Sequence, residues 1–350
     1  MKKLASLFAA LALLLALAAP GAAAEAQPQT GRIYLYGETH ADPACLAQEL
    51  EAWEGYYRHL GMRDLFIEVP SYAAAFMNLW MKAEDDAILS RLFEDWEGAA
   101  MHSQDVWDFY KAIKERCPET VFHGFDVGHQ YNTTGARYLI GLALTGQMGS
   151  ADWDEAQRVI DQGKQYYQTG DNAYRENAMT ENLTRAFEAL PMGASIMVIT
   201  GSAHSNLYAM DYYTGTVPCM ANQLRQQYGT ALVARNLSAG IDYARAGETA
   251  PVTLGGAEYT AVCLGEQDLT ALSDQYLSRT YWLIPDSYAA AAALPADGTV
   301  LPHTEYISPV ETGQVYCLDY LCADGSTVQW FYRADGALWQ DIPVTTGFAA

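Results

Sequence analysis

The stretch RIYLYGETH, residues 32–40, shows most directly how this chain folds. A tyrosine-rich apolar run leads into a glycine, and the titratable residues Glu38 and His40 follow at once. Such a run is typical of a buried strand, and the glycine allows a tight turn where the strand ends. The stretch ASIMVITGSAH, residues 194–204, repeats the arrangement and ends in His204. The two stretches therefore predict two strands, each with polar side chains at its carboxyl end.

Short β-rich runs alternate with longer helical patterns over residues 30–237. This alternation predicts βα units, and hence an α/β fold with a largely parallel sheet flanked by helices. The predicted strands are 32–36, 64–69, 120–126, 194–200 and 231–236. Helices are predicted over 43–59, 73–93 (as one or two helices), 106–117 and 172–190.

The pattern changes after about residue 239, where Gly, Thr, Tyr and Val alternate and helical periodicity weakens. Two Asp-Gly turn signals separate runs at 315–321, 327–333 and 337–342, which predict a β-meander. We therefore expect an α/β domain over 28–240 and a small β-rich C-terminal unit over 245–350.

The composition is that of an acidic globular protein. Of 350 residues, 20 are Lys or Arg and 42 are Asp or Glu, the net charge is −22, and 50% are hydrophobic. The hydrophobic content excludes a disordered chain. The shortage of basic residues argues against nucleic-acid partners, because phosphate contacts need clustered Lys and Arg.

Residues 1–24 have the features of an export signal. Lys2 and Lys3 precede an apolar run at 4–18, and small residues follow at 20–24. The pattern predicts a cleaved signal peptide and a secreted or extracytoplasmic protein, or an N-terminal anchor if the segment stays uncleaved. No later stretch has the roughly 20 apolar residues of a spanning helix, so no stable membrane insertion is expected after cleavage.

The chain has six cysteines. Cys317 and Cys322 are predicted on one strand, where five residues span about 16 Å, whereas a disulfide needs Cα atoms within about 7 Å. We expect several of the six to be free thiols.

Polar side chains end four of the five predicted strands. Because the carboxyl ends of parallel strands meet at one sheet edge, these groups are expected to converge although they lie far apart in the sequence. They are Glu38, His40, Glu68, Asp126 and His204. Two GxxH motifs at equivalent strand ends favour a functional site more strongly than one would.

Five motifs together resemble a known superfamily: GETH at 37–40, FIEV at 66–69, HGFD at 123–126, YRENAM at 174–179 and GSAH at 201–204. The chain resembles, over residues 31–237, the superfamily that joins the erythromycin esterases, the ChaN-like haem-uptake proteins and the Tiki and TraB proteins. The resemblance implies an α/β fold with a polar pocket at one sheet edge. The residues that it places in this pocket are Glu38, His40, Glu68, Arg175 and His204.

The resemblance implies two kinds of chemistry. From the esterases, His40 would activate water, whereas from the Tiki proteins the two GxxH motifs and a Glu would serve a metal-dependent peptidase. The sequence differs from the esterase pattern at Ala41, Glu176 and Ser202, where Gly, Asp and Asn are usual. These differences argue against macrolide specificity.

The residue types are consistent with hydrolysis. A neutral His beside a carboxylate takes a proton from water, so His40 is the candidate base, with Glu38 or Glu68 as its partner. Arg175 would stabilise an oxyanion or clamp a substrate anion, or would form a buried ion pair with one of these Glu residues. His204 would be a second base.

Further residues are expected around these catalytic groups. Asp126, His129 and Glu176 are the candidate substrate-binding residues, and Asp126 could instead orient Arg175. His123 lies inside a predicted strand and is expected to be structural.

The same side chains could hold a metal. By ligand type, His40, His204, Glu38 and Glu68 suit Zn, Mn, Fe or Co. The HExxH signature is absent, as is the GxSxG nucleophile motif. Metal-free and metal-dependent mechanisms both stay open.

The sequence thus predicts a secreted hydrolase that acts on an ester, lactone or amide bond of a small-molecule or peptide substrate. The alternative is a ChaN-like protein that binds haem or another ligand without catalysis. A third possibility is a degenerate enzyme whose β-rich unit recognises a surface.

Overall fold

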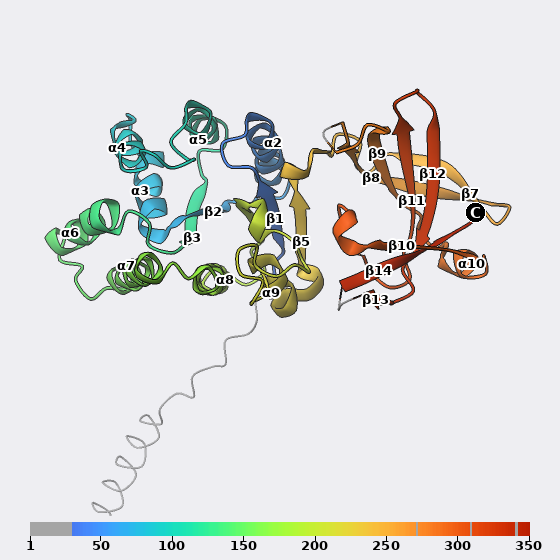
Figure 1. Ribbon diagram of the computed structural model, residues 1–350. Helices are drawn as coiled ribbons and strands as arrows, with labels where there is room; N and C mark the ends of the chain where they lie inside the picture. Colours follow the sequence, from blue (N-terminus) through green and yellow to red (C-terminus); the bar gives the residue numbers. More distant parts are fainter. Residues whose placement is uncertain (1–29, 271, 309, 340–341) are drawn as a thin grey trace, which may run out of the picture.

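The computed structural model describes residues 30–270, 272–308, 310–339 and 342–350. Figure 1 shows an α/β core built from the first part of the chain and, beside it, a β-rich unit built from the last part. The expected signal peptide at 1–24 lies outside the described residues. Within these ranges, no helix is long and apolar enough to cross a membrane.

The core contains the predicted parallel sheet, with strand order β3-β2-β4-β1-β5. The strands are β1 (Ile33–Glu38), β2 (Asp64–Pro70), β3 (Val121–Asp126), β4 (Ile196–Gly201) and β5 (Leu232–Asn236). Each lies within two residues of its predicted position. Glu38 pairs with Gly201 in register, so the ends of the two central strands lie side by side.

Helices cover both faces of this sheet (Figure 1). One face packs against α2 (Pro43–His59), α3 (Ser71–Met81), α4 (Ala87–Asp95) and α5 (Gln104–Arg116), and the other against α8 (Asn172–Glu188) and α9 (Met220–Tyr228). Neighbouring strand residues alternate between the two cores: Ile67 and Ile199 belong to the first, Phe66 and Val198 to the second. Burial on both sides explains why the strands are apolar throughout.

Two more helices, α6 (Ala136–Leu144) and α7 (Ala151–Thr169), were not predicted. A short π-helical segment, η1 (Tyr131–Gly135), leads into them after β3. Gly128 lies against α7 so closely that a Cβ there would come within 2.4 Å of the Val159 carbonyl oxygen, and this contact fixes the helix beside the end of β3.

The C-terminal unit is an antiparallel sheet with the order β10-β14-β12-β11-β9-β8-β6, to which β7 and β13 add at the sides. Its strands are β6 (Ile241–Asp242), β7 (Thr249–Leu254), β8 (Ala257–Asp268), β9 (Tyr276–Leu283), β10 (Ala296–Pro302), β11 (Val315–Cys322), β12 (Thr327–Arg333), β13 (Leu338–Trp339) and β14 (Ile342–Phe348). A short helix, α10 (Tyr288–Ala292), lies between β9 and β10. The expected fold class, a parallel α/β sheet followed by a β-rich unit, is confirmed.

The predicted meander is correct for its first two strands and wrong for the third. β11 and β12 pair as a hairpin, but the next neighbour of β12 is β14, with Phe331 opposite Phe348. Of the described residues in the run expected at 337–342, two form the short strand β13, which pairs with β14, and Ile342 begins β14 itself. A turn signal shows where a strand ends, and it does not specify which later strand becomes the sheet neighbour.

The six cysteines are buried and free, as expected for several of them. Cys317 and Cys322 lie at two positions of β11, which confirms that they share a strand.

Candidate functional site

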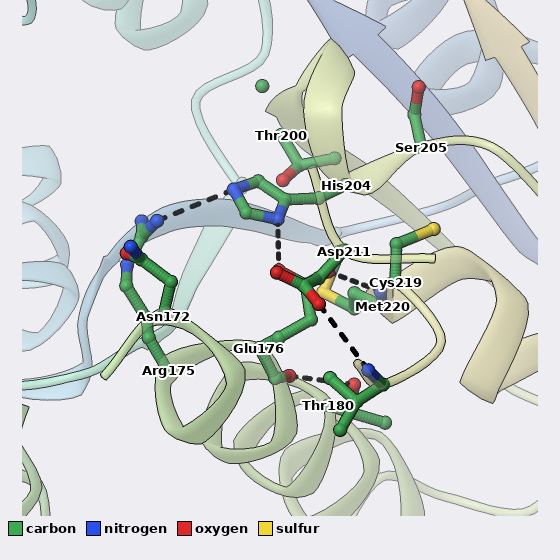
Figure 2. Close-up of polar contacts among 12 residues, drawn as sticks. Asn172, Arg175, Glu176, Thr180, Thr200, His204, Ser205, Asp211, Cys219 and Met220 are labelled. Carbon is green, nitrogen blue, oxygen red and sulfur yellow. Dashed lines mark hydrogen bonds and ion pairs between the residues drawn. The ribbon is translucent and has the colours of Figure 1, made fainter. Parts of the chain in front are cut away.

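The polar side chains predicted to converge do lie together, at the carboxyl ends of β1, β2, β3 and β4. Two groups can be distinguished there. The first is the pair Glu38 and His40, and the second is a network around Arg175 that includes His204, which Figure 2 shows between Arg175 and Glu176.

The first group is an imidazole held by a buried carboxylate. Glu38 ends β1 and is only 6% exposed, and its Oε1 lies 2.6 Å from Nδ1 of His40. The chain then turns through Ala41, at a φ of 61°, so that Asp42 caps α2 by accepting from the amides of residues 44 and 45. The His40 side chain remains 40% exposed, and Glu38 engages only its Nδ1.

The second group is a buried ion-pair network centred on a guanidinium. Arg175, from the first turn of α8, donates to Asp126 through Nε at 3.0 Å and Nη2 at 2.7 Å. Nη2 also donates to Oε1 of Glu68 at 2.7 Å. The other Glu68 oxygen accepts from the hydroxyl of Thr200 at 2.7 Å and from the amide of Gly201 at 2.6 Å. The network therefore ties β2, β3, β4 and α8 together at the sheet edge.

His204 joins this network from the end of β4. Its Nδ1 lies 2.6 Å from Oε2 of Glu176, and its Nε2 lies 3.4 Å from Nη1 of Arg175. The second oxygen of Glu176 accepts from the backbone amide of Met220, at the start of α9 (Figure 2). A helix N-terminus carries positive partial charge, which favours the ionised Glu176 carboxylate.

Gly201 joins the two groups. A Cβ built on it would lie 3.1 Å from Nε2 of His40 and 3.6 Å from Oε2 of Glu68. Both side chains therefore flank this glycine, and any larger residue there would push against the imidazole.

These contacts shift the titration of both imidazoles. The hydrogen bond to Glu38, helped by the negative charge of Glu68, raises the pKa of His40 to about 9. Burial lowers the pKa of His204, but the hydrogen bond to Glu176 and the charge of Glu68 outweigh it, so the pKa is raised. At a pKa of about 9 the His40 ring is protonated near neutral pH, and the contacts of His204 favour its protonated form.

The pKa values of two buried carboxylates are shifted downward. Burial raises the pKa of Glu68, but the positive charges of His204 and Arg175 outweigh it and hold the pKa at about 2. In the same way, Arg175 and His129 overcome burial and hold the pKa of Asp126 well below its usual range. Both groups are ionised at neutral pH.

The expected catalytic and substrate-binding residues all lie at this sheet edge, and two of the expected substrate-binding residues are buried within the network. Asp126 and Glu176 are 2% and 3% exposed, and both oxygens of each are engaged by protein groups. Asp126 contacts Arg175, and Glu176 contacts His204. His129 lies at the rim, bonded to Asp126 at 2.9 Å and to the Tyr167 hydroxyl at 2.5 Å.

His123 lies apart from the site, as predicted. It stacks on Phe66, with ring centroids 4.5 Å apart, and bonds to Asp64 at 2.8 Å.

Several members of the site were not predicted. Thr200, the amide of Gly201, the amide of Met220 and the Tyr167 hydroxyl all bond to site residues. Glu49, on α2, is fully buried, and both of its oxygens lack a hydrogen-bond partner, as does Oε2 of Glu38. Glu38, His40 and Glu49 are among the residues that line a cavity of about 20 Å³, about the volume that one water molecule needs.

The arrangement does not fit a metal ion held jointly by Glu38, His40, Glu68 and His204. The guanidinium of Arg175 already faces Oε1 of Glu68 and Nε2 of His204, and Glu38 engages Nδ1 of His40. Across the described part of the chain, no three His, Cys, Asp or Glu side chains form a group that could hold a metal.

No family model matches the chain, and no curated protein matches it. Among solved structures, a protein from Bacillus cereus is 12% identical, with a TM-score of 0.42 over 59% of this chain and 65% of its own length. A mutant of the erythromycin esterase EreC in its open conformation is 10% identical, with a TM-score of 0.43 over 72% of this chain and 82% of that one. ChaN of Campylobacter jejuni, described with cofacial haem binding, is 12% identical, with a TM-score of 0.31 over 58% of this chain and 80% of its own.

The chain thus spans 65% of the length of the Bacillus cereus protein. The erythromycin esterase and ChaN carry the names of two of the groups that the sequence motifs resemble.

Proposed function

We propose that this chain is a hydrolase that cleaves an ester, lactone or amide bond with water, and that the proton is transferred at Nε2 of His40. The observation that carries the proposal is the pair of Glu38 and His40. A buried carboxylate fixes one ring nitrogen at 2.6 Å, while the ring itself remains 40% exposed. This is the arrangement that a carboxylate-assisted general base requires.

The proton steps follow from this geometry. Neutral His40 carries its hydrogen on Nδ1, because Nδ1 donates to Glu38, and so Nε2 has the free electron pair. Nε2 takes a proton from water as the oxygen attacks the carbonyl carbon, and Glu38 stabilises the resulting imidazolium. The imidazolium then returns this proton to the leaving oxygen or nitrogen as the bond to carbon breaks.

Arg175 and His204 supply positive charge beside the reacting group. Nη1 of Arg175 lies beside His204 at 3.4 Å, whereas Nε and Nη2 bond to carboxylates, and the contact with Glu176 raises the pKa of His204. Charges that are already fixed by buried partners stabilise a developing oxyanion without further reorganisation.

The His40 to Gln variant tests the proposal with a panel of esters, lactones and amides. General-base catalysis is worth roughly 10²–10⁴ in rate, so a loss of about that size is expected for every substrate that the wild-type protein turns over. His123→Gln is the matched control, because His123 also bonds to a carboxylate but lies outside the site. Unchanged turnover in the His40 variant would rule out the mechanism.

The ChaN-like alternative is a ligand-binding protein, and the same preparation tests it. A Soret shift on addition of stoichiometric haem, without hydrolysis of any member of the panel, would favour haem binding over the proposed activity.

A further inference from the structure

A cavity of about 430 Å³ lies between the α/β core and the C-terminal sheet. Its core side is formed by residues 205–207, directly after the GSAH motif, and by β5, the core strand nearest the C-terminal unit in Figure 1. Its other side is formed by β8, β9 and the turn of helix η5 (His303–Glu305). None of the catalytic side chains described above lines it. The volume falls within the range of small-molecule sites.

Two buried polar atoms without a partner belong to residues that line this cavity: Nε of Arg279 and the hydroxyl of Tyr243. Arg279 is 7% exposed, and its other nitrogens are engaged. Nη2 donates to Gln267 at 2.8 Å, and Nη1 donates to the Tyr320 hydroxyl at 3.1 Å. Leaving a buried N–H or O–H without a partner costs about 1–3 kcal/mol of stability, so a hydrogen-bond acceptor would stabilise both groups.

The amide side chains of the cavity offer donors, because their oxygens are already used. Oδ1 of Asn206 accepts from the backbone amides of residues 208 and 209. Oδ1 of Asn236 accepts from the amide and the hydroxyl of Ser238. Each asparagine therefore presents its NH₂ group, which can only donate.

His303 adds another donor. Its Nδ1 accepts from the amide of Val310 at 3.2 Å, and burial lowers the pKa of the ring to about 4. The ring is therefore neutral at physiological pH and carries its hydrogen on Nε2.

Arginines lie in the lining of the cavity and behind it, although the chain as a whole carries a net charge of −22. Arg279 lines it, and Arg235 lies 4.6 Å from the centre of the Tyr243 ring. Arg225 stacks on Tyr208, at 4.3 Å from its ring centre. Glu305 is the single acidic residue among the described lining residues, and Arg279 lies 3.3 Å from it.

We propose that this cavity binds a small oxyanion ligand, a carboxylate or a phosphate, through Arg279, Tyr243, His303 and the amide groups of Asn206 and Asn236. A set of donors with positive charge behind it is complementary to a group that has only acceptors and a negative charge. The proposal is independent of the hydrolase chemistry, because the two sites share no residue.

Titration calorimetry on the full chain tests it with three probes: citrate, inorganic phosphate and the neutral polyol inositol. We expect saturable binding of citrate or phosphate with one site per chain, and the stronger of the two identifies the oxyanion class. Inositol is expected not to bind. Binding of inositol alone, or saturable binding of no probe, would overturn the proposal.

Variants then locate the site. Tyr243→Phe removes a single hydroxyl and should weaken anion binding several-fold, and Arg279→Gln should weaken it at least about tenfold, as expected for a charge-assisted contact. Arg245→Gln is the control, since Arg245 is an exposed arginine of the same unit that pairs with Glu248 and Glu266. Equal affinity in wild type and in Tyr243→Phe would contradict the assignment, even if Arg279→Gln failed to fold. His40→Gln should bind as wild type does, which separates this result from the test of hydrolysis.

Discussion

Replacing Glu38 with Gln tests the contact on which the proposed chemistry depends. The Glu38 carboxylate lies 2.6 Å from Nδ1 of His40 and is the largest cause of the rise in the pKa of His40 from 6.5 to about 9. The amide of the variant can still accept a hydrogen bond, but it has no charge. At pH 7 an imidazole with a pKa of about 9 is about 1% neutral, and one with its ordinary pKa is about three-quarters neutral. Solvent reaches His40, so we expect its titration midpoint to fall by at least about one pH unit rather than by the full difference.

The titration is followed by NMR of the histidine ring resonances, with His40→Ala to assign the signal. Asp64→Asn is the matched control, because it alters another carboxylate–imidazole pair, with a distance of 2.8 Å, outside the site. An unchanged midpoint for His40 in Glu38→Gln would refute the reasoning, since the imidazole would then not sense the carboxylate.

The same variant should also change how the stability of the protein depends on pH. Because the folded-state pKa of His40 is raised, its contribution to stability is complete below pH 6.5 and is lost as the pH rises through about 9. Glu38→Gln should therefore lose most stability relative to wild type below pH 6.5, and the difference should shrink above pH 9. A destabilisation that does not depend on pH would mean that Glu38 acts through packing alone.

Four further outcomes are expected. Arg175→Met leaves two buried carboxylates without their cation, so urea unfolding should show a loss of about 3–5 kcal/mol, whereas the exposed control Arg185→Met should lose little. Burial raises the pKa of Glu49, so its contribution to stability declines as the pH rises above 4.5; Glu49→Gln should melt at a higher temperature than wild type at neutral pH but not in acid, and equal pH dependence of the two would contradict this. The rate of hydrolysis should rise with pH toward about 9 as His40 loses its proton; a falling rate would make the imidazolium the reacting form. Dialysis against a chelator should leave turnover and melting temperature unchanged, and activity that is lost and then restored by Zn²⁺ or Mn²⁺ would contradict the assignment.

The sheet of the core could be predicted because its strands are buried on both faces. The central strands β1 and β4 therefore appear in the sequence as continuous apolar runs ended by a glycine or a charged residue, as in 32–40. The C-terminal sheet was harder to predict, because antiparallel order depends on contacts between distant strands. Nothing near the turn at residues 335–336 indicates that β12 pairs with β14 and that β13 is only a two-residue strand.

The site was predictable where side chains follow strand ends, and not where the backbone contributes. Glu38, His40 and His204 carry a signal because their position after a strand fixes where they lie. The amides of Gly201 and Met220 have no such signal in the sequence, because nearly every residue has a backbone amide. Only the fold places these two beside Glu68 and Glu176. Glu49 looks like one polar position of an amphipathic helix, and only the packing of α2 shows that it is buried.

The site combines buried groups that are fixed by their partners with one exposed side chain, that of His40. Glu68, Asp126 and Glu176 each have both oxygens bonded, and Arg175 is held by two of them. Such a network cannot change partners without leaving a buried charge unpaired, which is costly. The network therefore provides a fixed electrostatic field. The proposed chemistry then takes place at the exposed ring of His40. If this division is right, substitutions within the network should reduce stability together with activity, whereas substitutions of His40 should reduce activity while leaving the fold largely intact.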